Sequence, residues 1–570
     1  MRYVALATDY DGTLATEGQV DDATIAALTR LRESGRRLVL VTGRDLDDLL
    51  RVFPRIDLFD RVVAENGALL YRPATREELP LAERPPDAFA ALLRERGVDN
   101  LAVGRVIVAT WEPHETAVLE CIRDLGLELQ VIFNKGAVMV LPSGVNKASG
   151  LAVALAELGL SPHNAVGVGD AENDHALLAV CERGVAVANA LPMLKERADM
   201  VVDLPRGAGV AALIERMIAD DLLEVPPHAD RQQIVLGETA QGQPVRLAPL
   251  GHSVLIAGTS GSGKSTLATA MLEKLAAQGY QYCIIDPEGD YESFAGAVVL
   301  GDSQRAPGVD EVMDLLQRPD QSVVVNLLGI KLEDRPAFFE SLMPRLQELR
   351  ARTGRPHWVV VDEAHHLLPA TWDPAGITLP QRLDGVLMIT VHPDHLPSIA
   401  LAMVDTMVAF GERPDQAIAH FRGALGQGAA ASPPVTLEPG EALIWSRGAG
   451  GDPQRFHVQP PEAERQRHRR KYAEGELGAD RSFYFRGPEG KLNLRAQNLS
   501  LFMQLAEGVD DATWQHHLRQ GDYSRWFRDM IKDPELAEQA QAVESSADAP
   551  AAESRAAIRE LIDAKYTLPA

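Results

Sequence analysis

The chain has 570 residues, of which 46% are hydrophobic and 24% are charged, so we expect several folded domains rather than a single core. Its 56 Lys and Arg against 81 Asp and Glu give a formal net charge of −25, which argues against a large nonspecific nucleic-acid surface on the monomer. The three cysteines are far apart, no segment is long and apolar enough to cross a membrane, and the first residues lead directly into motif sequence without a signal peptide, so we expect a cytoplasmic protein with no membrane partner.

The first part of the chain alternates apolar runs with helical patterns, as βα units do. Residues 1–222 therefore predict an α/β domain with a core over 1–71 and 141–222. Strand patterns around a helical stretch predict a small α+β insertion over 72–140. A charged, proline-containing stretch over 223–232 is expected to be a linker.

A second alternating pattern over 233–460 predicts another α/β domain. Charged helical sequence over 461–542 predicts a small, mainly helical module. Aromatic residues around Trp514 and Trp526 in this module could form a bundle core or stack on nucleic acid, and we favour the core. The Ala/Glu/Ser-rich end, residues 543–570, predicts a flexible acidic tail.

Two carboxylates follow the first apolar run. Asp9 and Asp11 precede Gly12-Thr13, and in a loop after a strand one carboxylate can attack phosphorus while the other moves the leaving-group proton. A dianionic substrate beside carboxylates needs a cation, so Mg²⁺ is expected. By itself this pair of aspartates is weak evidence of a catalytic site, because a turn after a strand often has the same composition.

Three further motifs complete a set. A hydroxyl and a backbone N–H follow another strand at Thr42-Gly43, a lysine opens a helical run at Lys147, and two carboxylates follow a further strand at Asp170 and Asp174. In this order the four motifs resemble the haloacid dehalogenase (HAD) superfamily of phosphatases over roughly residues 1–220. The insertion between the second and third motifs resembles the C2-capped, Cof-like branch, which also contains sucrose-phosphate and phosphoglycolate phosphatases.

The resemblance implies a role for each motif residue. Asp9 would be the nucleophile that forms an aspartyl-phosphate, and Asp11 would be the general acid/base. The residues that would hold the substrate phosphate are Thr42, Gly43, Lys147 and Asn173. The Mg²⁺ ligands would be Asp9, the Asp11 carbonyl and Asp170, supported by Asp174. For Arg44, Glu172 and Asn66, a salt-bridge or turn role is as good an interpretation as a catalytic one.

A glycine-rich loop lies after a later strand and before a helix. Its glycines let backbone N–H groups surround the phosphates of ATP, while Lys264 would reach the β/γ oxygens and Ser265 would bind Mg²⁺. After another apolar strand, Asp362 would also bind Mg²⁺. The predicted ATP-binding residues are Gly258, Thr259, Ser260, Gly261, Ser262, Gly263, Lys264, Ser265, Thr266, Asp362 and Glu363.

The glutamate in this set indicates hydrolysis. Glu363 can activate an attacking water, whereas a small-molecule kinase uses the hydroxyl of its substrate. Together with Asp286–Tyr291 and a hairpin before the glycine loop, these motifs resemble the HerA/FtsK branch, specifically HerA-type ATPases, over about 233–450. That resemblance implies a ring, a homo-hexamer with ATP at subunit interfaces, and possible DNA translocation.

The two resemblances together imply an α/β fold class: a HAD Rossmann-like domain with a small α+β C2 cap, then a RecA-like P-loop ATPase domain and a small helical module.

Two features depart from the HerA-type pattern. His392 stands where a glutamine is usual, and we favour a packed or exposed histidine over a γ-phosphate sensor. A trans-acting arginine cannot be assigned between Arg413 and Arg422, and the nearby histidines lack a fourth ligand for zinc.

Our preferred interpretation is a Mg²⁺-dependent phosphomonoester hydrolase fused to an ATP-hydrolysing motor. Its substrate would be a small phosphorylated metabolite or a nucleotide. One alternative is a DNA-processing or defence translocase whose first domain trims nucleic-acid or nucleotide phosphates. Another makes the ATPase a regulator or assembly platform. A bifunctional small-molecule kinase/phosphatase is the third alternative, and Glu363 counts against it.

Overall fold

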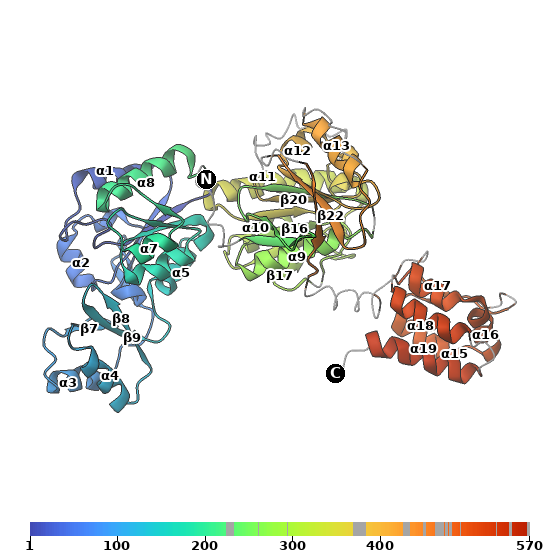
Figure 1. Ribbon diagram of the computed structural model, residues 1–570, viewed down its shortest axis with the longest axis horizontal. Coiled ribbons are helices and arrows are strands. Elements are labelled where there is room, and N and C mark those ends of the chain that lie inside the picture. The colour runs from blue at the N-terminus through green and yellow to red at the C-terminus, as the bar shows by residue number, and fades with distance from the viewer. Residues whose placement is uncertain are drawn as a thin grey trace. The chain divides into compact units, whose positions relative to one another are not determined.

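Two mainly parallel sheets organise residues 1–459, and residues 460–570 form a second unit that is described by itself (Figure 1). The computed structural model describes residues 1–223, 233–259, 261–292, 294–368, 384–425, 434–447, 452–461, 472, 477, 481–488, 490, 492–531, 533–545 and 550–566. All statements below refer to these residues. Most of the expected linker and of the charged stretch 461–480 lies outside them, as does Ser260.

The first sheet has the order β12-β11-β10-β1-β2-β3-β4-β5. Its strands are β1 (Ala5–Thr8), β2 (Arg37–Val41), β3 (Arg61–Ala64), β4 (Leu69–Arg72), β5 (Glu77–Pro80), β10 (Ala165–Gly169), β11 (Arg183–Ala186) and β12 (Met200–Val201). The central strands are Val/Leu/Ala-rich and buried apart from Arg37 at the start of β2, as expected for parallel strands with both faces covered. The accompanying helices are α1 (Asp22–Glu33), α2 (Leu46–Val52), α5 (Lys147–Glu157), α6 (His175–Val180), α7 (Pro192–Arg197) and α8 (Arg206–Asp220).

The predicted insertion forms a separate antiparallel sheet of order β6-β7-β9-β8. This cap consists of β6 (Ala102–Val103), β7 (Val108–Trp111), β8 (Leu129–Asn134), β9 (Ala137–Pro142), α3 (Asp87–Glu95) and α4 (Glu115–Asp124). Its predicted start at residue 72 is wrong, because β5 pairs with β4 in the first sheet. The turn at 73–76 returns the chain to that sheet before the cap begins.

The second sheet has the order β14-β13-β23-β22-β21-β15-β20-β19-β16-β18-β17, and its strands from β21 to β17 are parallel. Its strands are β13 (Ile234–Glu238), β14 (Pro244–Leu247), β15 (Ser253–Ala257), β16 (Tyr282–Asp286), β17 (Ala297–Leu300), β18 (Ser322–Asn326), β19 (Trp358–Val361), β20 (Val386–Thr390), β21 (Thr406–Ala409), β22 (Glu441–Ser446) and β23 (Gln454–Val458). Its helices are α9 (Lys264–Ala277), α10 (Val309–Leu316), α11 (Arg335–Thr353), α12 (Ser398–Ala402) and α13 (Pro414–Ala424). The predicted hairpin is β13–β14 at the antiparallel edge.

The two sheets contact each other through residues at the amino ends of their strands. Asn164, directly before β10, donates from Nδ2 to the Gly354 carbonyl at 3.3 Å. Its Oδ1 lies 3.3 Å from Nε2 of His357, directly before β19. Tyr280, two residues before β16, donates its hydroxyl to Glu182, directly before β11, at 2.8 Å. Strands of both sheets therefore start from one shared polar contact.

A buried arginine crosses the same contact. Arg355 is 0% exposed and donates to the carbonyls of Leu316 at 3.1 Å and Gln317 at 3.2 Å. It also donates to Gln281 Oε1 at 2.8 Å and, across the contact, to the Gly159 carbonyl. Burial lowers the pKa of this guanidinium to about 10, but four oxygen acceptors hold the charge in place.

We expect Arg355→Ala to lower the free energy of unfolding by about 3–5 kcal/mol, because buried oxygens lose their donor. The measurement is urea unfolding followed by tryptophan fluorescence, since Trp358 is fully buried three residues away. The matched control is Arg352→Ala, whose exposed side chain should contribute less than about 0.5 kcal/mol. Equal midpoints for the two variants would contradict the structural role of Arg355.

The second unit has an aromatic core. Its described elements are β24 (Phe483–Phe485), β25 (Leu494–Ala496), α15 (Leu499–Gly508), α16 (Asp511–Gln520), α17 (Asp522–Asp529), α18 (Pro534–Ser545) and α19 (Ala551–Tyr566). The Trp514 ring is 1% exposed and stacks on Tyr523 with centroids 4.5 Å apart. The aromatic residues therefore pack against one another, as the bundle interpretation expects.

The predicted flexible tail is wrong for most of residues 543–570. Helix α19 occupies residues 551–566, and its Ile558 and Ile562 side chains are buried in the core of the second unit. Composition suggested disorder, but apolar residues at helical spacing pack against α15 and α18. Among the described residues, no helix has both the length and the apolar character needed to cross a membrane.

Candidate functional site

The first site lies at the carboxyl edge of the first sheet. Asp9 follows β1, and the parallel register pairs Thr8 with Val168, so Asp9 and Asp170 leave the sheet side by side. Asp174 completes a buried trio whose carboxylate oxygens lie within 4.8 Å of one another. The motifs at the ends of β1 and β10 thus converge as predicted.

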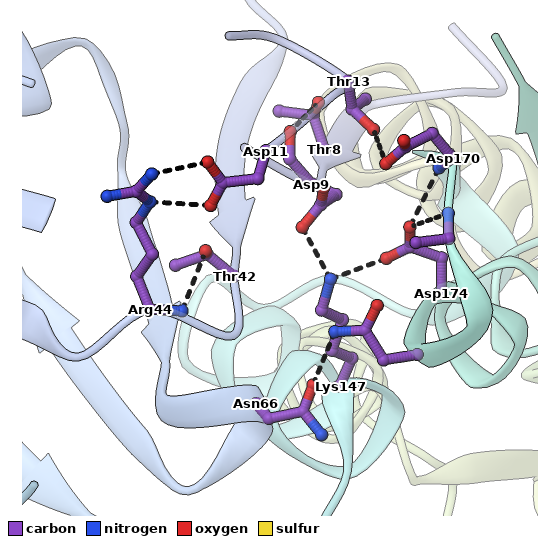
Figure 2. Close-up of polar contacts among 12 residues, drawn as sticks. Thr8, Asp9, Asp11, Thr13, Thr42, Arg44, Asn66, Lys147, Asp170 and Asp174 are labelled. Carbon is purple, nitrogen blue, oxygen red and sulfur yellow. Dashed lines mark hydrogen bonds and ion pairs between the residues drawn. The ribbon is translucent and has the colours of Figure 1, made fainter. Parts of the chain in front are cut away.

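A buried lysine ties this trio together (Figure 2). Lys147, the first residue of α5, donates from Nζ to Asp9 Oδ1 and Asp174 Oδ1, each at 2.6 Å. Asn146 fixes the start of the helix by accepting backbone N–H groups of its first turn. Burial and then Asp174 raise the pKa of Asp9. Burial acts to lower the pKa of Lys147, but Asp174 and Asp9 raise it above its usual value.

The side chain of Asp11 points to an arginine. It accepts from Arg44 Nε and Nη2, both at 2.6 Å, in the paired contact visible in Figure 2. Arg44 also pairs with Asp48 on α2. Arg44 therefore holds the carboxylate that is expected to act as general acid/base. The sequence left the role of Arg44 open, and in the structure this arginine forms a salt bridge with Asp11.

The expected phosphate-binding residues gather at the same edge. Thr42 follows β2, and its hydroxyl accepts a backbone N–H at 3.2 Å. A Cβ on Gly43 would lie 3.5 Å from Asn173 Nδ2 and 3.2 Å from Met139 Cε. Asn173 donates to Asn66 Oδ1 at 3.0 Å. The loops after β2 and β10 thus face each other across a narrow space that suits a small tetrahedral group.

The oxygens beside Asp9 suit a hard cation. Asp170 Oδ1 accepts from Thr13 Oγ1 at 3.2 Å. Lys135 Nζ lies 2.9 Å from Asp170 Oδ2 and 3.0 Å from the Asp11 carbonyl oxygen. Carboxylate and carbonyl oxygens are the ligands that Mg²⁺ prefers, and an ammonium group already lies against two of them. The residues present therefore fit the predicted metal.

A cavity of about 570 Å³ opens beside Asp9, between the core and the cap. Residues of the core that line it include Asp9, Asp11, Gly43, Arg44 and Asp48. Residues of the cap that line it include Val103, Ile107, Trp111, Lys135 and Met139. Its volume is in the usual range for a small-molecule site.

The second site begins with the glycine loop after β15. Gly258, Gly261 and Gly263 have φ angles of +157°, +77° and +109°, a conformation that glycine adopts without strain. Lys264 opens α9 and donates from Nζ to the Thr259 carbonyl at 3.0 Å, and burial lowers the pKa of this lysine. The predicted residues Ser265 and Thr266 lie in the first turn of α9, and Ser262 directly precedes Gly263.

Carboxylates follow two neighbouring strands of the second sheet. Asp362 comes after β19 and accepts the Glu363 backbone N–H at 2.9 Å. Asp286 ends β16 and holds the following loop, accepting the backbone N–H of Tyr291 at 2.8 Å and of Asp290 at 3.1 Å. Burial, then Asp286, raises the pKa of Asp362 well above its usual value. This crowding of carboxylates suits a site that receives a cation.

Comparison with known proteins identifies both regions. Residues 6–104 and 120–214 match the haloacid dehalogenase-like hydrolase family, and residues 234–348 match the central domain of helicase HerA. A phosphoglycolate phosphatase from Methanothermobacter thermautotrophicus is 30% identical over 221 residues, which cover 98% of that protein and 38% of this chain. The chain belongs to the haloacid dehalogenase-like hydrolases.

Other relatives of this hydrolase cover the same region. A phosphoglycolate phosphatase from Haloarcula marismortui is 34% identical over 214 residues, or 92% of that protein and 36% of this chain. A solved haloacid dehalogenase-like hydrolase from Bacteroides thetaiotaomicron has 21% identity and a TM-score of 0.33, over 38% of this chain and 99% of that one. The chain therefore joins a hydrolase domain of phosphatase type to a HerA-type ATPase domain.

One residue important to this hydrolase carries no functional signal in its sequence. Glu65 is 0% exposed and accepts the backbone N–H groups of Arg105, Val106 and Ile107 at 2.8, 2.7 and 2.9 Å. It therefore ties the core to the cap segment that lines the cavity. A buried acid directly after β3 was the available hint, but its partners lie 40 residues later in the chain.

The departures from the HerA-type pattern have simple structural accounts. His392 is exposed after β20 and stacks on His395, with centroids 4.6 Å apart, which agrees with the exposed-histidine interpretation. With Asp394 these residues form an exposed trio that has no fourth ligand among the described residues. The Arg422 guanidinium lies over the Trp445 ring at 5.4 Å, whereas the Arg413 side chain is exposed.

Proposed function

We propose that the hydrolase domain cleaves small phosphomonoesters through a covalent intermediate on Asp9, with Mg²⁺ as cofactor. The observation that carries the proposal is the buried contact of Lys147 with Asp9 and Asp174. A fixed ammonium beside a fixed carboxylate offsets the charge of a dianionic substrate facing that nucleophile. The family to which the chain belongs supports the same reaction class.

In the proposed reaction an oxygen of Asp9 attacks phosphorus while the bond to the leaving oxygen breaks. Asp11 leaves Arg44, takes up a proton from solvent and gives that proton to the leaving oxygen. A water then attacks the phosphorus of the aspartyl-phosphate, Asp11 takes up a proton from that water, and inorganic phosphate leaves. Asp11 releases this proton to solvent as it pairs with Arg44 again, so both carboxyl groups return to their starting states. Lys147 and the Thr42 hydroxyl bind phosphoryl oxygens throughout, helped by Gly43 N–H and Asn173.

The ligands proposed for Mg²⁺ are Asp9, Asp170 and the Asp11 carbonyl, with Asp174 supporting the set. The donor atoms support this choice, since Lys135 Nζ already lies against two of these oxygens. When bound, Mg²⁺ supplies positive charge beside the phosphoryl oxygens. Asp174 orients Asp170 by accepting its backbone N–H at 2.9 Å.

We propose phosphoglycolate or a similar small acid phosphate as the substrate class. The support is that relatives named phosphoglycolate phosphatase align over nearly their whole length. A cytoplasmic location is part of the proposal, supported by three buried free cysteines, Cys121, Cys181 and Cys283, a usage typical of reducing compartments.

Removing one proposed metal ligand should separate metal binding from folding. We expect Asp170→Asn to lower phosphate release from phosphoglycolate by about 100-fold or more, since a neutral amide is a poor Mg²⁺ ligand. In the wild type, millimolar Mg²⁺ should raise the melting temperature by about 2–4 °C, and the variant should lose this shift. The control is Asp57→Asn, an exposed carboxylate. A variant with wild-type activity and a wild-type Mg²⁺ shift would contradict the ligand assignment.

For the second domain we propose ATP hydrolysis with Lys264 and Ser265 at the phosphates and Mg²⁺, and Glu363 activating water. The match to the central domain of helicase HerA supports this, and it also motivates a homo-hexamer with nucleic acid as partner. Asp362 would complete the Mg²⁺ ligands. Glu363 supports hydrolysis over transfer to a small molecule, because a kinase has no need of a base for water.

A further inference from the structure

The cap reaches the proposed metal site through a single side chain. Strands β8 and β9 pair Asn134 with Ala137, so Lys135 and Gly136 form a two-residue turn, with φ angles of +49° and +85°. Positive φ at both positions is the geometry of a tight hairpin turn, and it is uncommon for lysine. The turn points the ammonium at Asp170 Oδ2 and the Asp11 carbonyl, 2.9 and 3.0 Å away.

This ammonium and a bound cation exclude each other. Mg²⁺ holds its oxygen ligands at about 2.1 Å, and the same two oxygens would be its ligands at Asp170 and Asp11. Two positive charges cannot share them at hydrogen-bond distance without strong repulsion. Metal binding therefore has to displace Lys135, whose side chain is 46% exposed and free to turn into the cavity.

The cavity offers the displaced ammonium one kind of partner. Among the described residues that line it, the cations are Arg44 and Lys135. Arg44 already makes a paired contact with Asp11 and a further one with Asp48. The neighbouring cap residues Val103 and Trp111 are apolar and exposed at 39% and 54%. Because hydrogen bonds between two charged groups are about twice as strong as neutral ones, the substrate group that pairs best with Lys135 is an anion, such as a carboxylate.

We propose that Lys135 determines specificity: it leaves the metal ligands when Mg²⁺ binds and then pairs with an anionic group on the leaving alcohol. The favoured substrates are thus phosphomonoesters that carry a carboxylate a few bonds from phosphorus. This inference rests on the proposed phosphatase function, and it specifies in addition that the substrate carries a second anionic group besides its phosphate.

The test compares phosphoglycolate with ethyl phosphate, which lacks the carboxylate. In Lys135→Met, the ratio of kcat/KM for phosphoglycolate to that for ethyl phosphate should fall about ten- to hundredfold, mainly through KM. Lys135→Arg, which retains the charge, should keep most of the ratio. The matched control is Arg123→Met, a cap cation whose side chain is 73% exposed, and it should keep the wild-type ratio.

A second readout needs no catalysis. In calorimetric titration with Mg²⁺ alone, Lys135→Met should bind the metal about threefold tighter or more, because the competing ammonium is gone. An unchanged ratio, or an unchanged Mg²⁺ affinity, would overturn the role of Lys135 while leaving phosphatase activity standing. If the wild type hydrolyses neither phosphate ester, the proposed function fails and this inference falls with it.

Discussion

Replacing Asp9 with asparagine should abolish phosphomonoester hydrolysis. An amide keeps the size of the side chain and can still accept the hydrogen bond from Lys147, but it cannot attack phosphorus. We expect phosphate release to fall by about 10⁴-fold or more, as is usual when a covalent nucleophile is removed. The measurement is release of inorganic phosphate from phosphoglycolate under saturating Mg²⁺.

The fusion supplies its own control for this variant. ATP turnover by the second domain should stay at the wild-type rate in Asp9→Asn, which shows that the chain is folded and loaded with nucleotide. The exposed Asp57→Asn should keep both activities. Phosphate release by Asp9→Asn at the wild-type rate would refute the assignment of the nucleophile.

Substituting Glu363 with glutamine should stop ATP hydrolysis but leave ATP binding intact. One carboxylate oxygen of Glu363 is buried and accepts no hydrogen bond from the described residues, with His365 Nδ1 at 3.5 Å as its ion-pair neighbour, so it can still accept a proton from a water at the γ-phosphate. Burial raises the pKa of Glu363, which strengthens it as a base. We expect ADP production to fall by about 10²–10⁴-fold, while binding of a fluorescent ATP analogue changes little.

The control is Glu348→Gln, an exposed position on α11, which should turn over ATP like the wild type. Adding duplex DNA tests the proposed partner: it should accelerate ADP production by the wild type and not by Glu363→Gln. ATP turnover by Glu363→Gln at the wild-type rate would rule out this base. If duplex DNA leaves the rate of ADP production by the wild type unchanged, nucleic acid is not a partner of this domain.

Several of the predicted site residues follow parallel strands, whereas Lys147 and Lys264 open helices. Asp9 after β1 and Asp170 after β10 had to meet, because the carboxyl ends of adjacent parallel strands share one edge of the sheet. Thr42 after β2 and Asp362 after β19 lie at the same kind of edge, and the sequence singled them out through their motifs. Local strand patterns carried this information, so no knowledge of the cap was needed.

Contacts between the core and the cap could not be predicted in this way. Glu65 finds its donors at residues 105–107, and Lys135 finds its acceptors at Asp11 and Asp170. These contacts depend on how the separate cap sheet packs on the core. The residue pattern of neither segment contains information about that packing. Asp11 shows the same limit, since its motif predicted the residue and not its contact with Arg44.

Composition misled at the end of the chain. Residues 543–570 are rich in Ala, Glu and Ser, which resembles disordered sequence. The positions that are buried in α19, namely Ala551, Ser554, Ile558 and Ile562, recur at helical spacing along one face. Ala551 and Ser554 are small, so the hydrophobic pattern of α19 is weak in the sequence. The helix becomes evident only from its packing against the other helices of the second unit.

The contact between the two sheets determines where the two reaction centres lie relative to it. The sheets meet where β10 and β19 begin, whereas Asp170 and Asp362 stand where these strands end. About 13–17 Å of strand separates each carboxylate from the contact. Each reaction centre therefore lies at the edge of its sheet opposite to the contact. An influence of ATP turnover on the phosphatase through this contact would pass along the strands to the pairs Asn164–His357, Glu182–Tyr280 and Gly159–Arg355.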